Sequence, residues 1–117
     1  MSAHGNIIVI TITTMLLCGL ADSETYTVGD NGRWEFGVGD WPNGKSFNSG
    51  DVLVFNYDPS VHNVVIVSQE NYDSCTASGT TLTSGHDSVT LSSETSYYIC
   101  GVSAHCQGGM KMAVTAS

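Results

Sequence analysis

The stretch SYYICGVSAHCQGGMKMAVT, residues 96–115, decides the fold. It holds two short runs rich in β-branched and aromatic residues, SYYI and KMAVT, on either side of a glycine-containing segment. Successive side chains of a strand point to opposite faces, so alternate residues of the second run share a face. One face carries Met110, Met112 and Val114, and the other carries Lys111 and Thr115. The pattern predicts two strands joined by a loop whose ends come close together.

The remainder of residues 22–117 is also typical of a β-protein. Glycine or proline recurs so often between residues 29 and 59 that no helix of ordinary length fits there. The other apolar segments are rich in residues that favour strands. They predict strands at 25–28, 52–57, 61–67 and 87–91, with a short helix around 69–75. Six or more short strands indicate an all-β domain, a β-sandwich or barrel, with one or two short helices.

The first 21 residues differ from the rest. Residues 7–21 form an uncharged apolar run, shorter than the roughly 20 residues that a membrane-spanning helix needs. Gly19 and Ala21 are small residues at positions -3 and -1 of a cleavage site after Ala21. We predict a secretory signal peptide at 1–21, cleaved at 21–23, in preference to a buried first strand. The mature domain, 22–117, is expected to be secreted without a membrane anchor, because no second apolar run follows.

The chain is strongly acidic. Its 117 residues include 3 Lys or Arg against 11 Asp or Glu, so the formal net charge is -8. Such a charge excludes nucleic acid as a partner, because contacts to phosphate need basic side chains. It also disfavours anionic membrane surfaces. An acidic surface steers positively charged proteins, so we expect a basic partner.

The segment between the two strands carries three side chains that bind metals. Cys100, His105 and Met110 are each separated by four residues, and a loop between strands can turn all three toward one centre. Soft and borderline donors of this kind suit copper, and a His₂Cys site with an axial methionine needs a second histidine. His62 is the better choice, because it opens a predicted strand after a turn. His86 lies in a polar turn and is expected to be exposed.

The number of cysteines is compatible with this site. Cleavage of the signal peptide would remove Cys18 and leave three cysteines, which cannot all pair within the chain. If Cys100 is the metal thiolate, Cys75 and Cys106 remain to pair, and secretion favours disulfides. Pairing of Cys100 with either of them would remove the ligand instead.

The same side chains are compatible with roles that need no copper. His62 and Met110 could be core residues, and the odd cysteine could form an intermolecular disulfide. A zinc hydrolase could use the cysteine and histidines with a water, and Asp87 could approach as its base. A thiol enzyme could use Cys100. An extracellular interaction or signalling protein, with structural or incidental copper, is a further alternative.

A set of segments spread over the predicted domain carries a family pattern. The segments are YTVGD at 26–30, Trp34, DWP at 40–42, Phe47, GDVLVFNY at 50–57, VHNV at 61–64, YYIC at 97–100 and HCQGGMK at 105–111. With these segments the chain resembles the phytocyanin family of plant blue copper proteins, and within it the plantacyanin branch. Two features depart from the pattern. Ser103-Ala104 stand where many members have Pro-Gly, and the chain is acidic where plantacyanins are often basic.

The resemblance implies a cupredoxin-like Greek-key fold with one copper ion near one end of the sandwich. It implies the equatorial ligands His62, Cys100 and His105, the axial ligand Met110, and a disulfide between Cys75 and Cys106. The implied function is one-electron transfer by a type 1 copper site that cycles between Cu(II) and Cu(I), in a secreted, monomeric protein of the apoplast or cell wall. Catalysis is not expected, because protein side chains occupy all four positions. We expect His105 to have a solvent-facing edge within an apolar patch that docks an unidentified redox partner.

Overall fold

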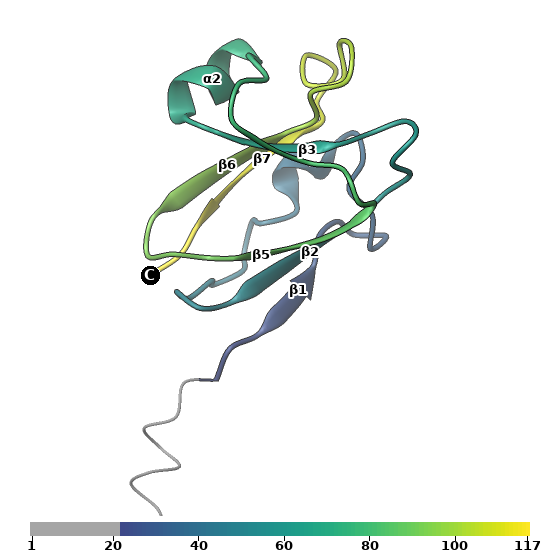
Figure 1. The fold of residues 1–117 in the computed structure, drawn as a ribbon. Coiled ribbons are helices and arrows are strands. Elements are labelled where there is room, and N and C mark those ends of the chain that lie inside the picture. The colour runs from purple at the N-terminus through teal and green to yellow at the C-terminus, as the bar shows by residue number, and fades with distance from the viewer. Residues whose placement is uncertain (1–21) are drawn as a thin grey trace, which may run out of the picture.

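The computed structural model describes residues 22–117, and two β-sheets packed against each other make up most of this region (Figure 1). The first sheet has the order β1-β2-β5, from the strands Thr25–Thr27, Val52–Asn56 and His86–Thr90. The second has the order β4-β3-β6-β7, from Thr80–Leu82, Val64–Val67, Thr95–Ile99 and Lys111–Thr115. Two short helices complete it, η1 (Val38–Asp40) and α2 (Gln69–Ser74). The predicted all-β sandwich with short helices is confirmed.

The chain passes repeatedly from one sheet to the other. It crosses between β2 and β3, between β4 and β5, and between β5 and β6. All paired strands are antiparallel except β1 and β2, which run parallel. As a result, β3 and β6 become neighbours in the sheet, and the end of β6 lies beside the start of β3. The predicted signal peptide, 1–21, lies outside the described residues.

The predicted strands are confirmed, with shifts at their ends that have local causes. β3 begins at Val64 and not at residue 61, because the N–H groups of Val61 and His62 both donate to the carbonyl of Asp58 and close a turn. His86 is the first residue of β5, opposite Asn56, where the sequence predicted a turn. β4 was not predicted, since its residues Thr-Thr-Leu are mostly exposed at a sheet edge and show no apolar alternation.

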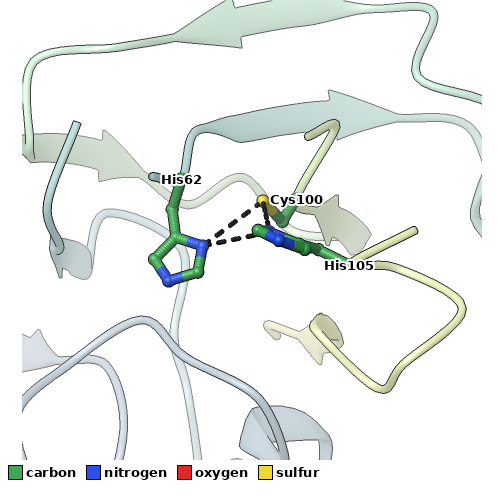
Figure 2. Close-up of side chains that lie close together, drawn as sticks. All are labelled: His62, Cys100 and His105. Carbon is green, nitrogen blue, oxygen red and sulfur yellow. Dashed lines mark hydrogen bonds between the residues drawn. The ribbon is translucent and has the colours of Figure 1, made fainter. Parts of the chain in front are cut away.

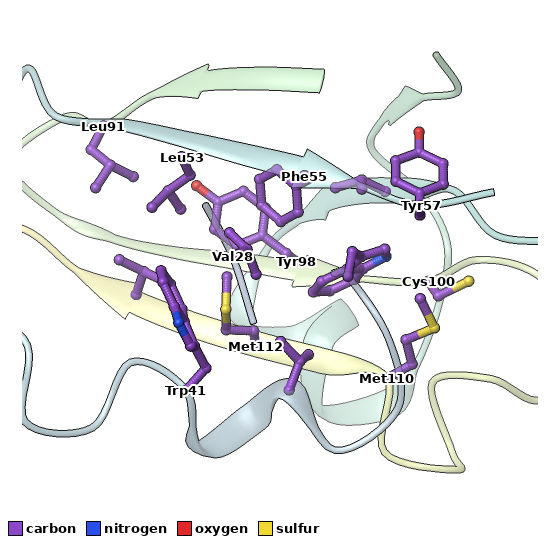
Figure 3. Packing of buried hydrophobic residues seen from close by; sticks show 14 of the residues in the cluster. Val28, Trp41, Leu53, Phe55, Tyr57, Leu91, Tyr98, Cys100, Met110 and Met112 are labelled. Atoms are coloured by element: carbon purple, nitrogen blue, oxygen red, sulfur yellow. The ribbon is translucent and has the colours of Figure 1, made fainter. Parts of the chain in front are cut away.

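The core lies between the sheets and ends at the loop of residues 100–110. β7 alternates as predicted, with Met112 and Val114 buried and Thr115 exposed. Leu53 and Phe55 of β2 face them from the other sheet. Figure 3 shows the packed cluster, with Leu91 at one end and Tyr57, Cys100 and Met110 at the other. The loop that joins β6 to β7 therefore starts and finishes inside the core.

A second, smaller cluster lies on the outer face of the β3–β6 sheet, beneath α2. Its buried members are Val65, Val67, Ile99 and Cys106. α2 starts at a Ser68 cap, whose hydroxyl accepts the N–H of Asn71. The helix packs Tyr72 against this cluster. No helix within residues 22–117 is long and apolar enough to cross a membrane.

Candidate metal centre

His62 stands at the end of a tight turn that leads into β3. The carboxylate of Asp58 accepts hydrogen bonds from the N–H and the hydroxyl of Ser60, at 2.9 and 2.6 Å. The carbonyl of Asp58 accepts the N–H of His62 at 2.9 Å. Such local bonds are the reason why aspartate and serine favour turns. The turn therefore fixes the backbone of His62 before the strand begins.

Cys100 and Met110 are the two ends of the loop between β6 and β7. The N–H of Cys100 donates to the carbonyl of Met110 at 3.0 Å, and the N–H of Met110 donates to the carbonyl of His105 at 3.0 Å. The N–H of His105 in turn donates to the carbonyl of Val102 at 3.1 Å. These bonds coil the loop back on itself. All three predicted ligands of this loop are thus held by main-chain hydrogen bonds that leave their side chains free.

The structure brings His62, Cys100 and His105 together (Figure 2). Nδ1 of His62 lies 3.2 Å from Nδ1 of His105 and 3.8 Å from the sulfur of Cys100. The Cys100 sulfur lies 3.4 Å from Nδ1 of His105. Cys100 is buried, and both imidazoles are half-buried. The same ring atom of each histidine therefore points at one thiol.

Met110 adds a fourth donor at this end of the core. Its side chain is fully buried, and Figure 3 shows it beside Cys100. Two imidazole nitrogens, a thiolate and a thioether form a donor set that fits copper. Zinc fits less well, because its usual ligands are sulfur of cysteine, nitrogen of histidine and carboxylate oxygen. No carboxylate joins the three clustered side chains among the described residues.

Asn63 joins the two segments that carry the ligands. Its side-chain oxygen accepts the N–H of Gly101 at 2.7 Å, next to Cys100. Its carbonyl accepts the indole N–H of Trp34 at 2.9 Å, and Trp34 is buried in the main core. Asn63 was not identified from the sequence, although it directly follows His62. It holds the end of β6 at a fixed distance from the start of β3.

A disulfide holds the other side of the loop. Cys75 and Cys106 are bonded, with their Cα atoms 5.7 Å apart, and this confirms the expected pair. Cys75 ends α2 in a left-handed conformation with φ of 54°. Cys106 is buried and directly follows His105. Among the described residues Cys100 is the free cysteine, as the copper hypothesis requires.

Phe36 covers the two imidazoles from outside. Its ring centroid lies 5.0 Å from that of His105 and 6.0 Å from that of His62. Burial, followed by the charge of His105, lowers the pKa of His62, whereas the carboxylates of Asp58 and Glu35 oppose this shift. A lowered pKa favours the neutral imidazole, which is the form that binds metals. Phe36 gave no signal in the sequence, because a single exposed aromatic residue belongs to no periodic pattern.

Asp87 and His86 do not belong to this cluster. Asp87, considered above as the base of a zinc hydrolase, accepts hydrogen bonds from the hydroxyls of Tyr57 and Ser84 and is not one of the side chains that cluster with Cys100. Burial, together with the bond to Asp87, raises the pKa of Tyr57 to about 12. His86 is exposed, as predicted, and its ring forms a hydrogen bond with the side chain of Asn56 on the neighbouring strand. Burial of Cys100 disfavours a reactive thiol, and among residues 22–117 no carboxylate joins the cluster to serve a zinc hydrolase as its base.

Comparison with known proteins gives the family. Residues 12–110 match the plastocyanin-like domain. The chain belongs to this family of blue copper proteins. A chemocyanin from Lilium longiflorum is 53% identical over 111 residues, which cover 93% of this chain and 88% of that protein. A basic blue protein from Arabidopsis thaliana is 45% identical over 118 residues, which cover 98% of this chain and 92% of the relative.

A solved structure agrees with the sequence relatives. The cucumber basic protein, a blue copper protein, superimposes with a TM-score of 0.77 at 46% identity, over 80% of this chain and 99% of that chain. The phytocyanin resemblance and the cupredoxin-like fold are thereby confirmed. Copper is the cofactor of this blue copper family, and the convergence of His62, Cys100 and His105 offers a place for it.

Proposed function

We propose that His62, Cys100, His105 and Met110 hold one copper ion, and that the protein carries single electrons. The observation behind this proposal is the convergence of both Nδ1 atoms on the Cys100 sulfur, at 3.8 and 3.4 Å. When bound, copper supplies a centre that accepts one electron as Cu(II) and gives it up as Cu(I). Electron transfer is fast when the ligands move little between the two states.

The chain supplies that rigidity. Asn63 fixes Gly101 relative to β3, and the Cys75–Cys106 disulfide fixes the residue after His105. Close packing limits the loop as well, because a Cβ added at Gly101 would lie 2.9 Å from the side chain of Val65. The ligands therefore keep their positions through hydrogen bonds, a covalent link and packing. Residues that hold the ligands in place in this way also tune the properties of a bound metal.

The same residues exclude water and leave a short path to the surface. Cys100 and Met110 are buried, so the sulfur donors have no solvent contact. The two half-buried imidazoles lie between them and the exterior, with Phe36 packed on both rings. Electrons would enter and leave through an imidazole edge. The four protein donors leave no position for a substrate, so we propose a carrier and not an enzyme.

Voltammetry of the copper-loaded protein tests this function. We expect a reversible one-electron wave with small peak separation at moderate scan rates, because the ligand set stays in place. The Cys100→Ser variant is the matched control and should lose the wave. An irreversible wave, or one that is unchanged in Cys100→Ser, would refute electron transfer at this site. Turnover of added substrates without exchange of electrons would support an enzyme instead.

We also propose that the protein acts outside the cell. The predicted signal peptide at 1–21 supports this, as does the disulfide, because such bonds persist in oxidising compartments. Expression of the full chain in plant cells tests it. We expect the protein in the apoplastic fluid, with an N-terminus at residues 22–24. Retention inside the cell with Met1 intact would contradict secretion.

A further inference from the structure

We infer that a cleft in the segment after β1 binds one pyranose ring of a carbohydrate. The cleft is lined by residues between positions 29 and 41, a segment that contains η1, and has a volume of about 140 Å³. Phe36 is the lining residue that also packs on the candidate copper ligands. The inference adds a binding function to the chain and does not depend on electron transfer.

The backbone of this segment is fixed in the absence of a ligand. The N–H of Gly32 donates to the carbonyl of Gly29 at 3.0 Å, and the N–H of Trp34 donates to the carbonyl of Asn56 at 2.8 Å. A Cβ added at Gly29, where φ is 96°, would lie 2.0 Å from the carbonyl oxygen of Arg33, so the chain folds back closely on itself there. A preformed cleft binds a small ligand with little loss of conformational entropy.

The inner wall of the cleft is apolar. Val38 and Trp41 line it and are only 4% and 7% exposed. The ring of Trp41 is held in the core by Tyr26 and Phe47, with centroid distances of 6.4 and 5.9 Å. Phe36, which is exposed, lines the cleft nearer the surface. The wall therefore offers a ligand ring an apolar surface that does not move.

The outer wall of the cleft carries four polar side chains. They are two carboxylates, an amide and a guanidinium, from Asp30, Glu35, Asn31 and Arg33. Among the described residues, one hydrogen bond joins members of this set, from the amide of Asn31 to the carboxylate of Glu35 at 3.4 Å. That bond is long, so most donors and acceptors of the four side chains remain available. Polar groups of this kind orient a ligand that lies on an apolar wall.

The size and the chemistry of the cleft fit a pyranose. A cavity of about 150 Å³ holds a benzene molecule, so the cleft has room for one six-membered ring. A pyranose presents C–H bonds on its faces and hydroxyl groups around its edge. A hydroxyl group both donates and accepts hydrogen bonds. Such a ring can lie on the apolar wall while its hydroxyls donate to the carboxylates and accept from the guanidinium and the amide.

Other classes of small ligand fit less well. An apolar ring would leave the four polar side chains desolvated and without partners, which is costly. An anion would be repelled by the two carboxylates. A calcium ion takes six to eight oxygen ligands, and within residues 22–117 the one group of clustered metal donors is His62, Cys100 and His105. An uncharged sugar ring meets none of these objections.

NMR titration of the ¹⁵N-labelled protein tests the inference. The probes are D-glucose, D-galactose and D-mannose. At least one of them should shift the amide signals of residues 29–41, with a dissociation constant of about 1–5 mM, because so small a ligand binds weakly. Two control ligands are tetrahydropyran-2-methanol, which lacks the ring hydroxyls, and D-galacturonate, which adds a negative charge. Both should bind at least fivefold more weakly than the best hexose.

Matched variants assign the binding to the cleft. Asp30→Ala/Glu35→Ala removes both carboxylates and should weaken binding at least fivefold, since each loses a charge-assisted hydrogen bond. Glu70→Ala/Asp73→Ala removes two exposed carboxylates of α2 and should change the affinity less than twofold. Phe36→Ala removes an exposed part of the apolar wall and should also weaken binding. Equal affinity of the cleft variant and the α2 variant would overturn the inference.

Methyl glycosides of the best hexose identify the source of the ring. Unchanged affinity for a methyl glycoside would support the terminal residue of a glycan, because the anomeric oxygen then faces solvent. Loss of affinity would support a free monosaccharide. The absence of shifts at 100 mM of all three hexoses, or shifts confined to another face, would overturn the site. Sugar binding by a protein that takes up no copper would overturn the proposed electron transfer alone.

Discussion

Removal of the Cys75–Cys106 disulfide should destabilise the protein by an amount that the loop length sets. The two cysteines are 31 residues apart, and closing a loop of that size removes unfolded-state entropy worth about 3.7 kcal/mol at 25 °C. With an unfolding entropy of about 2.1 cal/mol/K per residue for residues 22–117, this corresponds to a fall in Tm of about 18 °C. The variant to use is Cys75→Ala/Cys106→Ala, because a single substitution would leave a thiol that could pair with Cys100.

Urea unfolding of the metal-free double variant, followed by tryptophan fluorescence, measures this loss. The unmodified protein treated with dithiothreitol is the control and should lose the same free energy, because it opens the same loop. Copper affinity should also fall, because Cys106 anchors the residue after His105. A loss of unfolding free energy below about 1 kcal/mol in both samples would refute the loop-closure account.

Three further predictions concern single residues. Asn63→Ala leaves the N–H of Gly101 without its acceptor and should lower the unfolding free energy by about 1–3 kcal/mol in urea titrations. Gly29→Ala should abolish folding or lower Tm far more than Gly44→Ala. The added Cβ at residue 29 would lie 2.0 Å from a carbonyl oxygen, whereas a Cβ at residue 44 would meet no atom and would be disfavoured only by the positive φ of that residue. The raised pKa of Tyr57 contributes stability that is complete below pH 10 and lost as pH rises toward about 12, so Tyr57→Phe should flatten this part of the stability profile.

Each of these predictions has an outcome that would contradict it. Wild-type stability in Asn63→Ala would show that water replaces the bond to Gly101 without loss. Similar Tm values for Gly29→Ala and Gly44→Ala, measured by circular dichroism, would show that the turn at residue 29 relaxes. A Tyr57→Phe protein that loses stability between pH 10 and 12 as steeply as the wild type would assign the titration to other groups.

The sequence predicted the parts of the site that local patterns encode. The alternation around Met112 and the spacing of Cys100, His105 and Met110 follow from the strand–loop–strand segment alone. His62 was found because a turn precedes its strand. These signals are local, and each survives in the structure as a strand end or a hydrogen-bonded loop.

The parts that sequence reasoning missed depend on contacts between distant segments. Asn63 matters because it meets Gly101, 38 residues away, and no pattern in either segment encodes that contact. Phe36 matters because the loop before η1 lies against the imidazoles, and an isolated exposed aromatic residue carries no periodic signal. β4 pairs at a sheet edge through backbone bonds, which polar threonines form as readily as apolar residues.

Titration of the metal-free protein with Cu(II) tests the central claim most directly. The absorption and electron paramagnetic resonance spectra are recorded for the wild type and for Cys100→Ser. The account predicts saturation at one equivalent, with an intense blue thiolate-to-copper band and a narrow copper hyperfine splitting, both lost in Cys100→Ser. A colourless complex with the broad splitting of ordinary Cu(II), or a blue band that survives in Cys100→Ser, would contradict it.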